Sequence, residues 1–221
     1  MQRVDAIRNI VQDSLVRLEQ THVAREVALP LSRQVIHACA AAIRAAHRHE
    51  YQESNQLLGE AHKHLQHIQS ALVDHSEIYF TGYVSDAQKE FAEAHATLAF
   101  LSESPLPGPR ELHIEVPSYL NGLAEAASEL RRTILDALRK DDVARCEGWM
   151  AIMDEIYSFL VTVDYPEAIT GGLRRTTDQL RGVLERTRGD LTLALRQRSL
   201  EEKLAQFQSK VSKGMTPLND S

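Results

Sequence analysis

The chain has 221 residues, of which 43% are hydrophobic and 25% charged, and its formal net charge is −6 at pH 7. These proportions are ordinary for a globular protein, and no apolar run approaches the 18 or so residues that a membrane span needs, so we expect no membrane association. The acidic balance argues against a general electrostatic binder of nucleic acid. A chain with this net charge can still bind nucleic acid through a localised basic surface.

The ends of the chain and its cysteines indicate a cellular location. The first residues are amphipathic and include acids, so we expect neither a signal peptide nor a transit peptide. The two cysteines, Cys39 and Cys146, stand alone inside helical patterns, outside any zinc-binding spacing. Reduced thiols are the default for such cysteines, and we expect a cytoplasmic protein.

Helical periodicity begins near the N-terminus. A first helix is predicted from about Asp5 to Arg48, with a bend at Pro30 because proline removes a backbone donor and clashes with the preceding turn. At about 1.5 Å per residue, this helix is far longer than a typical globular helix. A second helix covers about Tyr51–Val73, and a third about Ser85–Leu101. Residues 74–84, which are apolar and β-branched, are expected to form a packed connector.

The second half of the chain continues the pattern after a break. Three prolines and a glycine within residues 102–111 predict a stiff loop. A fourth helix is predicted from Pro117 to just before Lys140, since proline is tolerated in a first turn. A fifth spans about Val143–Val163, a sixth about 164–188, and a last helix follows.

These elements predict one fold class. With only 10 Gly and 7 Pro there is little room for a turn-rich β fold. We expect an all-α, single-domain antiparallel bundle of about seven helices with a long first helix. The helical domain should cover residues 1–208, and the polar residues 209–221 should form a disordered tail.

Two pairs of glutamates carry the most chemical information. Glu90 and Glu93 lie on one predicted helix, and Glu125 and Glu129 on another. Residues three or four apart are neighbours on a helix, with Cβ atoms about 5–6 Å apart. If the two helices pack side by side, four carboxylates meet, and they cannot all stay ionised without a cation. Oxygen ligands suit Mg²⁺, Mn²⁺ or Ca²⁺, and Mg²⁺ most often serves phosphate chemistry, which indicates metal-assisted phosphodiester cleavage.

A simpler interpretation of these glutamates stays open. Glutamate is a good helix former and usually lies on a solvated face. Both pairs, however, border the apolar stripes of their helices, where a carboxylate can face a cleft.

Basic residues form several groups with two interpretations. Arginines and histidines cluster at Arg44–His49, at Arg131–Arg132 and across Arg174–Arg198. These groups could grip phosphates, or they could form solvated pairs with acids three residues away. The histidines His62–His64 and His67 point in different directions on a helix, so we expect exposed side chains there and no metal site.

Several segments, in order, match the motifs of a known family. They are Leu31–Arg33, I-x-x-x-H-R at Ile43–Arg48, EFAEA at 90–94, SYLNGLAEAASELRR at 118–132 and the helical segment 164–191. From about Arg25 to Leu195 the chain resembles the translin/Trax family, and more closely its Trax-like branch. Glu125 stands where Trax has an aspartate.

The resemblance implies an assembly and an activity. It implies a helical bundle that forms a hollow homo-oligomer, from hexamer to octamer, or assembles with a second translin-type subunit. Such particles bind RNA and single-stranded DNA on the inner wall. Trax carries a Mg²⁺-dependent endoribonuclease site of acidic residues. Glu90, Glu93, Glu125 and Glu129 match that set, which implies that they are both the metal ligands and the catalytic residues.

The function predicted from the sequence is therefore cleavage of single-stranded RNA. The glutamates would hold Mg²⁺, or Mn²⁺, and Arg33, Arg44, His47 and Arg48 would contact the RNA backbone. Aromatic residues make up only 5% of the chain, so base stacking and sequence preference should be weak. Two alternatives stay open: a non-catalytic, translin-like cage that binds single-stranded nucleic acid, and a structural helical adaptor.

Overall fold

The computed structural model describes residues 2–140 and 142–214, and every regular element in these ranges is a helix. Six long helices make up most of the chain: α1 (Gln2–His47), α2 (Tyr51–Ala71), α4 (Gly82–Ser102), α6 (Val116–Leu138), α7 (Val143–Leu160) and α9 (Leu173–Gly214). Three single turns lie between them: α3 (Ser76–Tyr79), α5 (Pro109–Leu112) and α8 (Glu167–Thr170). The predicted all-α bundle with a long first helix is confirmed.

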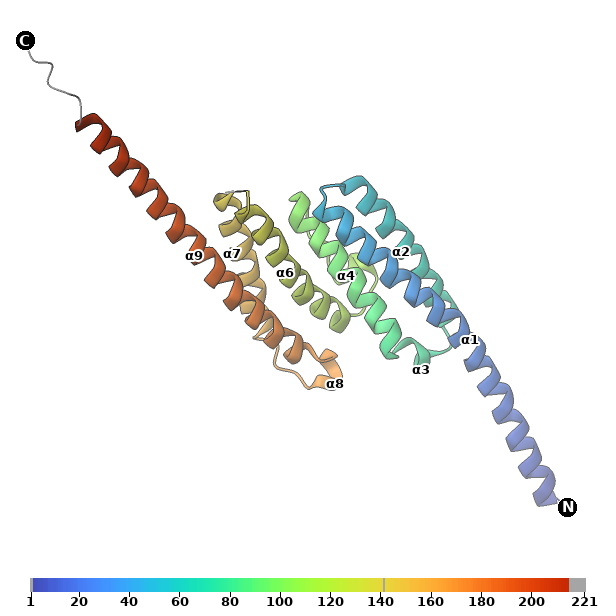
Figure 1. The fold of residues 1–221 in the computed structure, drawn as a ribbon. Coiled ribbons are helices and arrows are strands. Elements are labelled where there is room, and N and C mark those ends of the chain that lie inside the picture. Colours follow the sequence, from blue (N-terminus) through green and yellow to red (C-terminus); the bar gives the residue numbers. More distant parts are fainter. Residues whose placement is uncertain (1, 141, 215–221) are drawn as a thin grey trace, which may run out of the picture.

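The long helices pack side by side as an elongated bundle (Figure 1). Helix α1 contacts α2 and α4, α4 contacts α6, and α6 contacts both α7 and α9. The core between them is apolar and well covered, and its largest fully buried side chains include Ile68, Phe91, Leu130, Ile134 and Met153. Helices α4 and α6 therefore lie in the middle of the bundle, next to each other.

The contact between α4 and α6 is unusually close at one point. Gly122 of α6 lies against the backbone of α4, where a Cβ atom would stand 2.4 Å from the carbonyl oxygen of Lys89 and 2.9 Å from the amide nitrogen of Glu93. No side chain larger than hydrogen fits at this separation without moving the helices. The glycine thus brings the predicted acidic segments of the two helices together.

Some helix boundaries differ from those predicted. Helix α1 runs through Pro30 as one α-helix. The connector 74–84 contains the turn α3 and the start of α4, and the loop 102–111 ends in α5, where Glu111 accepts a hydrogen bond of 2.6 Å from the Gly108 amide.

The C-terminal part departs most from the prediction. The predicted sixth and last helices are one element, α9, because the sequence between them holds no proline and only the isolated Gly189 as a breaker. The break comes earlier, at Gly171 and Gly172, which both have positive φ. The helix continues through residues 209–214, and the rest of the predicted tail lies outside the described residues.

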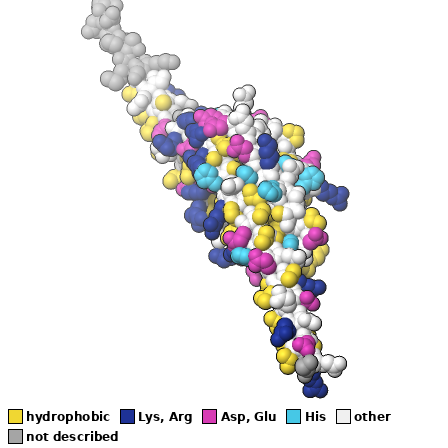
Figure 2. Space-filling model, turned by 90° about the vertical axis from the view of Figure 1, so that its right-hand side faces the viewer, with side chains coloured by type: hydrophobic (Ala, Val, Ile, Leu, Met, Phe, Trp, Pro, Cys, Tyr) yellow, Lys and Arg dark blue, Asp and Glu magenta, His cyan; other side chains and the backbone are white. Residues whose placement is uncertain are grey.

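The two longest helices extend beyond the bundle at opposite ends (Figure 1). The extensions carry exposed apolar side chains at helical spacing: Val4, Ile7, Val11 and Leu18 on α1, and Leu193, Leu200, Leu204, Phe207 and Val211 on α9. Figure 2 shows hydrophobic side chains on the surface of the narrow lower end, which is the N-terminal extension of α1. No helix among the described residues combines the length and the hydropathy that a membrane span requires.

A candidate metal centre between α4 and α6

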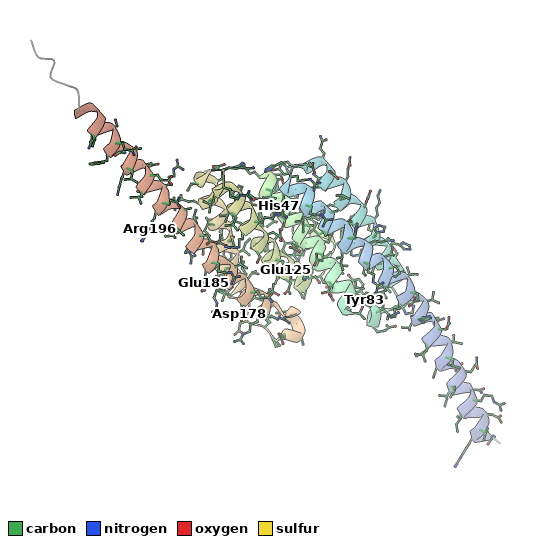
Figure 3. All side chains as sticks on the ribbon, viewed as in Figure 1. His47, Tyr83, Glu125, Asp178, Glu185 and Arg196 are labelled. Atoms are coloured by element: carbon green, nitrogen blue, oxygen red, sulfur yellow. The ribbon has the colours of Figure 1, made fainter. Side chains whose placement is uncertain are left out.

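Three carboxylates meet where the two central helices approach each other. Glu90 and Glu93 are three residues apart on α4, and Glu125 faces them from α6, one turn beyond Gly122. Each of the three offers a carboxylate oxygen, and these oxygens all lie within 4.8 Å of one another. The structure therefore brings together three of the four predicted glutamates, and Figure 3 shows Glu125 in the middle of the bundle.

The three carboxylates disfavour one another's charge. Burial raises the pKa of Glu93 to about 8, and the charges of Glu90, Glu125 and Glu129 contribute to the increase. Burial also raises the pKa of Glu90, although Lys89 opposes this. Crowded, partly dehydrated carboxylates of this kind favour a cation, and an all-oxygen set suits a hard divalent ion such as Mg²⁺ or Mn²⁺. The residues thus fit the metal that the family resemblance implies.

A lysine reaches into the same cluster. The Nζ atom of Lys89 lies 2.8 Å from Oε1 of Glu125 and 3.8 Å from Oε1 of Glu90, so its ammonium group joins α4 to α6. Burial lowers the pKa of Lys89, but the hydrogen bond and charge of Glu125, with the charges of Glu90 and Asp86, outweigh it and the net shift is upward. Sequence reasoning missed this residue, and only its position directly before Glu90 could have indicated it.

The fourth glutamate has a different partner. Oε2 of Glu129 lies 2.9 Å from Nε2 of His47, at the end of α1, and Thr133 lies 3.4 Å from the other ring nitrogen of His47. The hydrogen bond from His47 lowers the pKa of Glu129, against the effect of burial. Glu129 is near enough to act on the charge of Glu93 but does not join the three clustered oxygens.

The predicted nucleic-acid contacts separate into two groups. The side chain of His47 is only 5% exposed, and its Nε2 atom lies 2.9 Å from Oε2 of Glu129. Arg33, Arg44 and Arg48 are exposed; the spacing of Arg33 and Arg44 places them on one side of α1, and Arg48 directly follows its last residue. Arg48 pairs with Glu50 and Glu53, while no ion pair of Arg33 or Arg44 occurs within the described residues.

The remaining cysteines and histidines also have defined places. Cys39 and Cys146 are both free and buried. Burial raises the pKa of Cys39, with Glu90 and Glu93 adding to it, so this part of α1 lies beside the acidic cluster. The α2 histidines are not uniformly exposed: His62 is half-buried, with its ring 5.9 Å from that of Phe91, whereas His67 is exposed.

The fold and the site together define a class: an α-helical bundle with an acidic cluster between two central helices. No family model matches the sequence. The chain is 34% identical over 186 residues to the uncharacterized protein MJ0175 of Methanocaldococcus jannaschii, covering 83% of this chain and 82% of that protein.

Solved structures identify the family. The AfC3PO–duplex RNA complex is similar with a TM-score of 0.78 and 30% identity, covering 85% of this chain and 97% of that one. AfC3PO alone has a TM-score of 0.77, again with 30% identity, over 85% and 98% of the two chains. NeC3PO without ligand shares the fold, with a TM-score of 0.69 and 16% identity over 85% and 96%. The chain belongs to the translin/Trax family, as its motifs predicted.

Proposed function

We propose that this protein is a divalent-metal-dependent endoribonuclease. The observation that carries the proposal is the meeting of Glu90, Glu93 and Glu125, whose oxygens lie within 4.8 Å of one another between two helices held together at Gly122. Helix interfaces rarely bury several carboxylates together unless they bind a cation.

The proposed ligand is RNA. AfC3PO, which shares 30% identity with this chain, has been solved in a complex with duplex RNA. The exposed Arg33 and Arg44 on one side of α1, with the exposed Arg48 directly after its end, provide charged donors for phosphate oxygens. Because the sequence predicted single-stranded RNA and the relative holds a duplex, both forms belong in the assay, together with single-stranded DNA.

Each acidic residue has a distinct proposed role. Glu90, Glu93 and Glu125 would hold Mg²⁺ or Mn²⁺, which when bound supplies Lewis-acid activation of water and of the phosphoryl group. Glu93, deepest in the interface, would give up its proton to provide a charged ligand. Glu129 is oriented by His47 one helical turn from Glu125, and it would complete the acidic set as a fixed negative charge.

The proposed assembly is a hollow homo-oligomer, from hexamer to octamer, with room for a second translin-type subunit. The exposed apolar stripes on the extensions of α1 and α9 support an oligomer, because they leave more apolar surface than one protomer covers. The free, buried Cys39 and Cys146 support a reducing compartment, and we place the protein in the cytoplasm.

A second candidate function is a non-catalytic, translin-like cage for single-stranded nucleic acid. One observation favours it: two of the four glutamates already have cationic or hydrogen-bonding partners within the protein, since Lys89 contacts Glu125 and His47 contacts Glu129. In such a protein the acids would serve only to join the helices.

Cleavage of end-labelled RNA distinguishes the two candidates. The endoribonuclease should cut RNA in Mg²⁺ or Mn²⁺, stop in EDTA, and lose activity in Glu93→Gln. The matched control is Glu60→Gln, which changes an exposed glutamate on α2 far from the cluster in sequence. Binding of RNA without metal-dependent cleavage would support the cage instead.

A further inference from the structure

We propose that Lys89 is a tethered cation that occupies the metal position in the acidic cluster, and that a divalent ion must displace it. This inference rests on the proposed metal centre and concerns how that centre is loaded. Its basis is the position of one atom: Nζ of Lys89 lies 2.8 Å from an oxygen of Glu125 and 3.8 Å from an oxygen of Glu90. These are two of the three candidate ligands.

The lysine is not an ordinary surface ion pair. Its side chain is 25% exposed, as is that of Glu90, and the side chain of Glu125 is 30% exposed. The bond to Glu125 crosses from α4 to α6, whereas the exposed pairs on single helices, such as Asp178 with Arg181, link neighbouring turns. A partly dehydrated contact between helices is stronger than a solvated one and is screened less by salt.

The backbone fixes where the ammonium group can go. The carbonyl oxygen of Lys89 is the atom closest to the Cβ position of Gly122, so the lysine starts from the point of closest approach between α4 and α6. From there the side chain reaches Glu125, three residues after Gly122 on α6. The same close contact that gathers the carboxylates therefore also delivers a positive charge to them.

Charge explains why the two cations exclude each other. Once Glu93 has given up its proton, the three carboxylates carry three negative charges, of which one ammonium group would neutralise one and a divalent ion two. An ion bound to Glu90 and Glu125 would lie close to Nζ of Lys89, and like charges repel at that separation. Lys89 must therefore turn away as the ion binds, and its charge lowers the affinity of the empty site for metal.

Mn²⁺ titration of the purified full-length chain, with free Mn²⁺ followed by electron paramagnetic resonance, tests the proposal. Lys89→Met removes the charge and keeps the length of the side chain, and it should bind Mn²⁺ at least roughly tenfold more tightly than the wild type. Lys89→Arg keeps the charge and should bind no more tightly. The control Lys63→Met changes an exposed lysine on α2 and should leave the affinity unchanged.

Metal-free stability gives a second measurement. In EDTA, Lys89→Met should unfold at a lower temperature than the wild type, because the carboxylates lose their only close ammonium group within the described residues. Added Mn²⁺ should raise its unfolding temperature by more than it raises that of the wild type. If Lys89→Met does not fold without metal, Lys89→Gln, which is neutral but can still donate a hydrogen bond to Glu125, takes its place.

Two failures can be told apart. If the wild type and the neutral variants bind Mn²⁺ equally, or the variants bind it more weakly, the role of Lys89 is wrong while the metal centre stands. If none of the folded proteins binds Mn²⁺, the metal centre itself is wrong, and the proposed endoribonuclease with it.

Discussion

Glu93 and Glu129 belong to the same acidic region, but their surroundings shift their pKa values in opposite directions. Burial and three neighbouring carboxylates raise the pKa of Glu93 to about 8. The hydrogen bond from His47, 2.9 Å away, lowers the pKa of Glu129. Where the protein supplies a partner of its own, the carboxylate is already stabilised; where it supplies too little positive charge, an ion from solution can bind.

The largest effect should come from removing the crowded carboxylate. Glu93→Gln should reduce Mn²⁺-dependent RNA cleavage by at least roughly 100-fold, because a neutral amide is a poor ligand for a hard cation. The same variant should be no less stable than the wild type in EDTA, since it relieves repulsion among the acids. Single-turnover cleavage beside a melting curve measures both. If Glu93→Gln cleaves RNA at the wild-type rate, Glu93 is not the carboxylate left for a metal ion, and the distinction from Glu129 is wrong.

A methyl group at the helix contact should separate the two halves of the site. Gly122→Ala places a Cβ atom 2.4 Å from the carbonyl oxygen of Lys89, so the helices must move apart. We expect the free energy of unfolding to fall by about 3 kcal/mol, with weaker Mn²⁺ binding. Denaturant titration measures the change in the free energy of unfolding.

A matched substitution controls for helix propensity. Gly59 lies inside α2 with nothing within 4 Å of its Cβ position, so Gly59→Ala should be stabilising by up to about 1 kcal/mol. Equal effects of the two substitutions would show that the contact at Gly122 does not hold the site together.

The pH dependence of stability should distinguish the two glutamates. Between the ordinary pKa of 4.5 and the folded value of about 8, folded Glu93 keeps a proton that the unfolded chain has released. The free energy of unfolding should therefore fall as pH rises through this window, by about 2 kcal/mol after allowance for partial solvent exposure. Glu129, with its lowered pKa, contributes stability that is present above the unfolded value and lost only as pH falls below it.

Denaturant titrations in EDTA, at about pH 5 and about pH 8, measure this difference. In Glu93→Gln the free energy of unfolding should fall less between these two pH values than in the wild type. The contributions of the histidines and of Glu90 are present in both proteins and do not affect the comparison. Identical declines in the wild type and the variant would show that Glu93 is not the group that titrates.

The smallest effect extends the comparison to two arginines, Arg44 in the last turn of α1 and Arg48 directly after it. Arg48 is already paired with Glu50 and Glu53, whereas no ion pair of Arg44 occurs in the part of the chain that the structure describes. Arg44→Ala should lower RNA affinity about threefold and reduce the slope of log K against log salt, and Arg48→Ala should change both less. Fluorescence anisotropy at several salt concentrations measures the RNA affinity and its salt dependence for both variants. A larger loss with Arg48→Ala would contradict this ranking.

Periodicity and spacing were sufficient to predict much of this molecule. The 3.6-residue pattern predicted the bundle, and the spacing of Glu90 and Glu93 predicted two carboxylates on one face. The partner of Glu129 could not be predicted, because the contact with His47 depends on how α1 and α6 are rotated against each other. For the same reason the role of Lys89 was missed, since a lysine beside a glutamate is ordinary on a solvated helix.

Gly122 shows a signal that could have been used. A glycine inside an otherwise good helix costs stability, so its presence in the interior of α6 indicates a close approach of another backbone. The continuity of α9 was missed for the opposite reason: Gly189 alone is too weak to end a helix that packs against α6 and α7.

The most direct test of the metal centre is a crystal soaked in Mn²⁺ and measured at the manganese absorption edge. An anomalous peak is predicted among Glu90, Glu93 and Glu125, with Lys89 turned away from Glu125 and His47 still bound to Glu129. A peak at another position, or none at Mn²⁺ concentrations that support RNA cleavage, would contradict the assignment of this cluster as the metal centre.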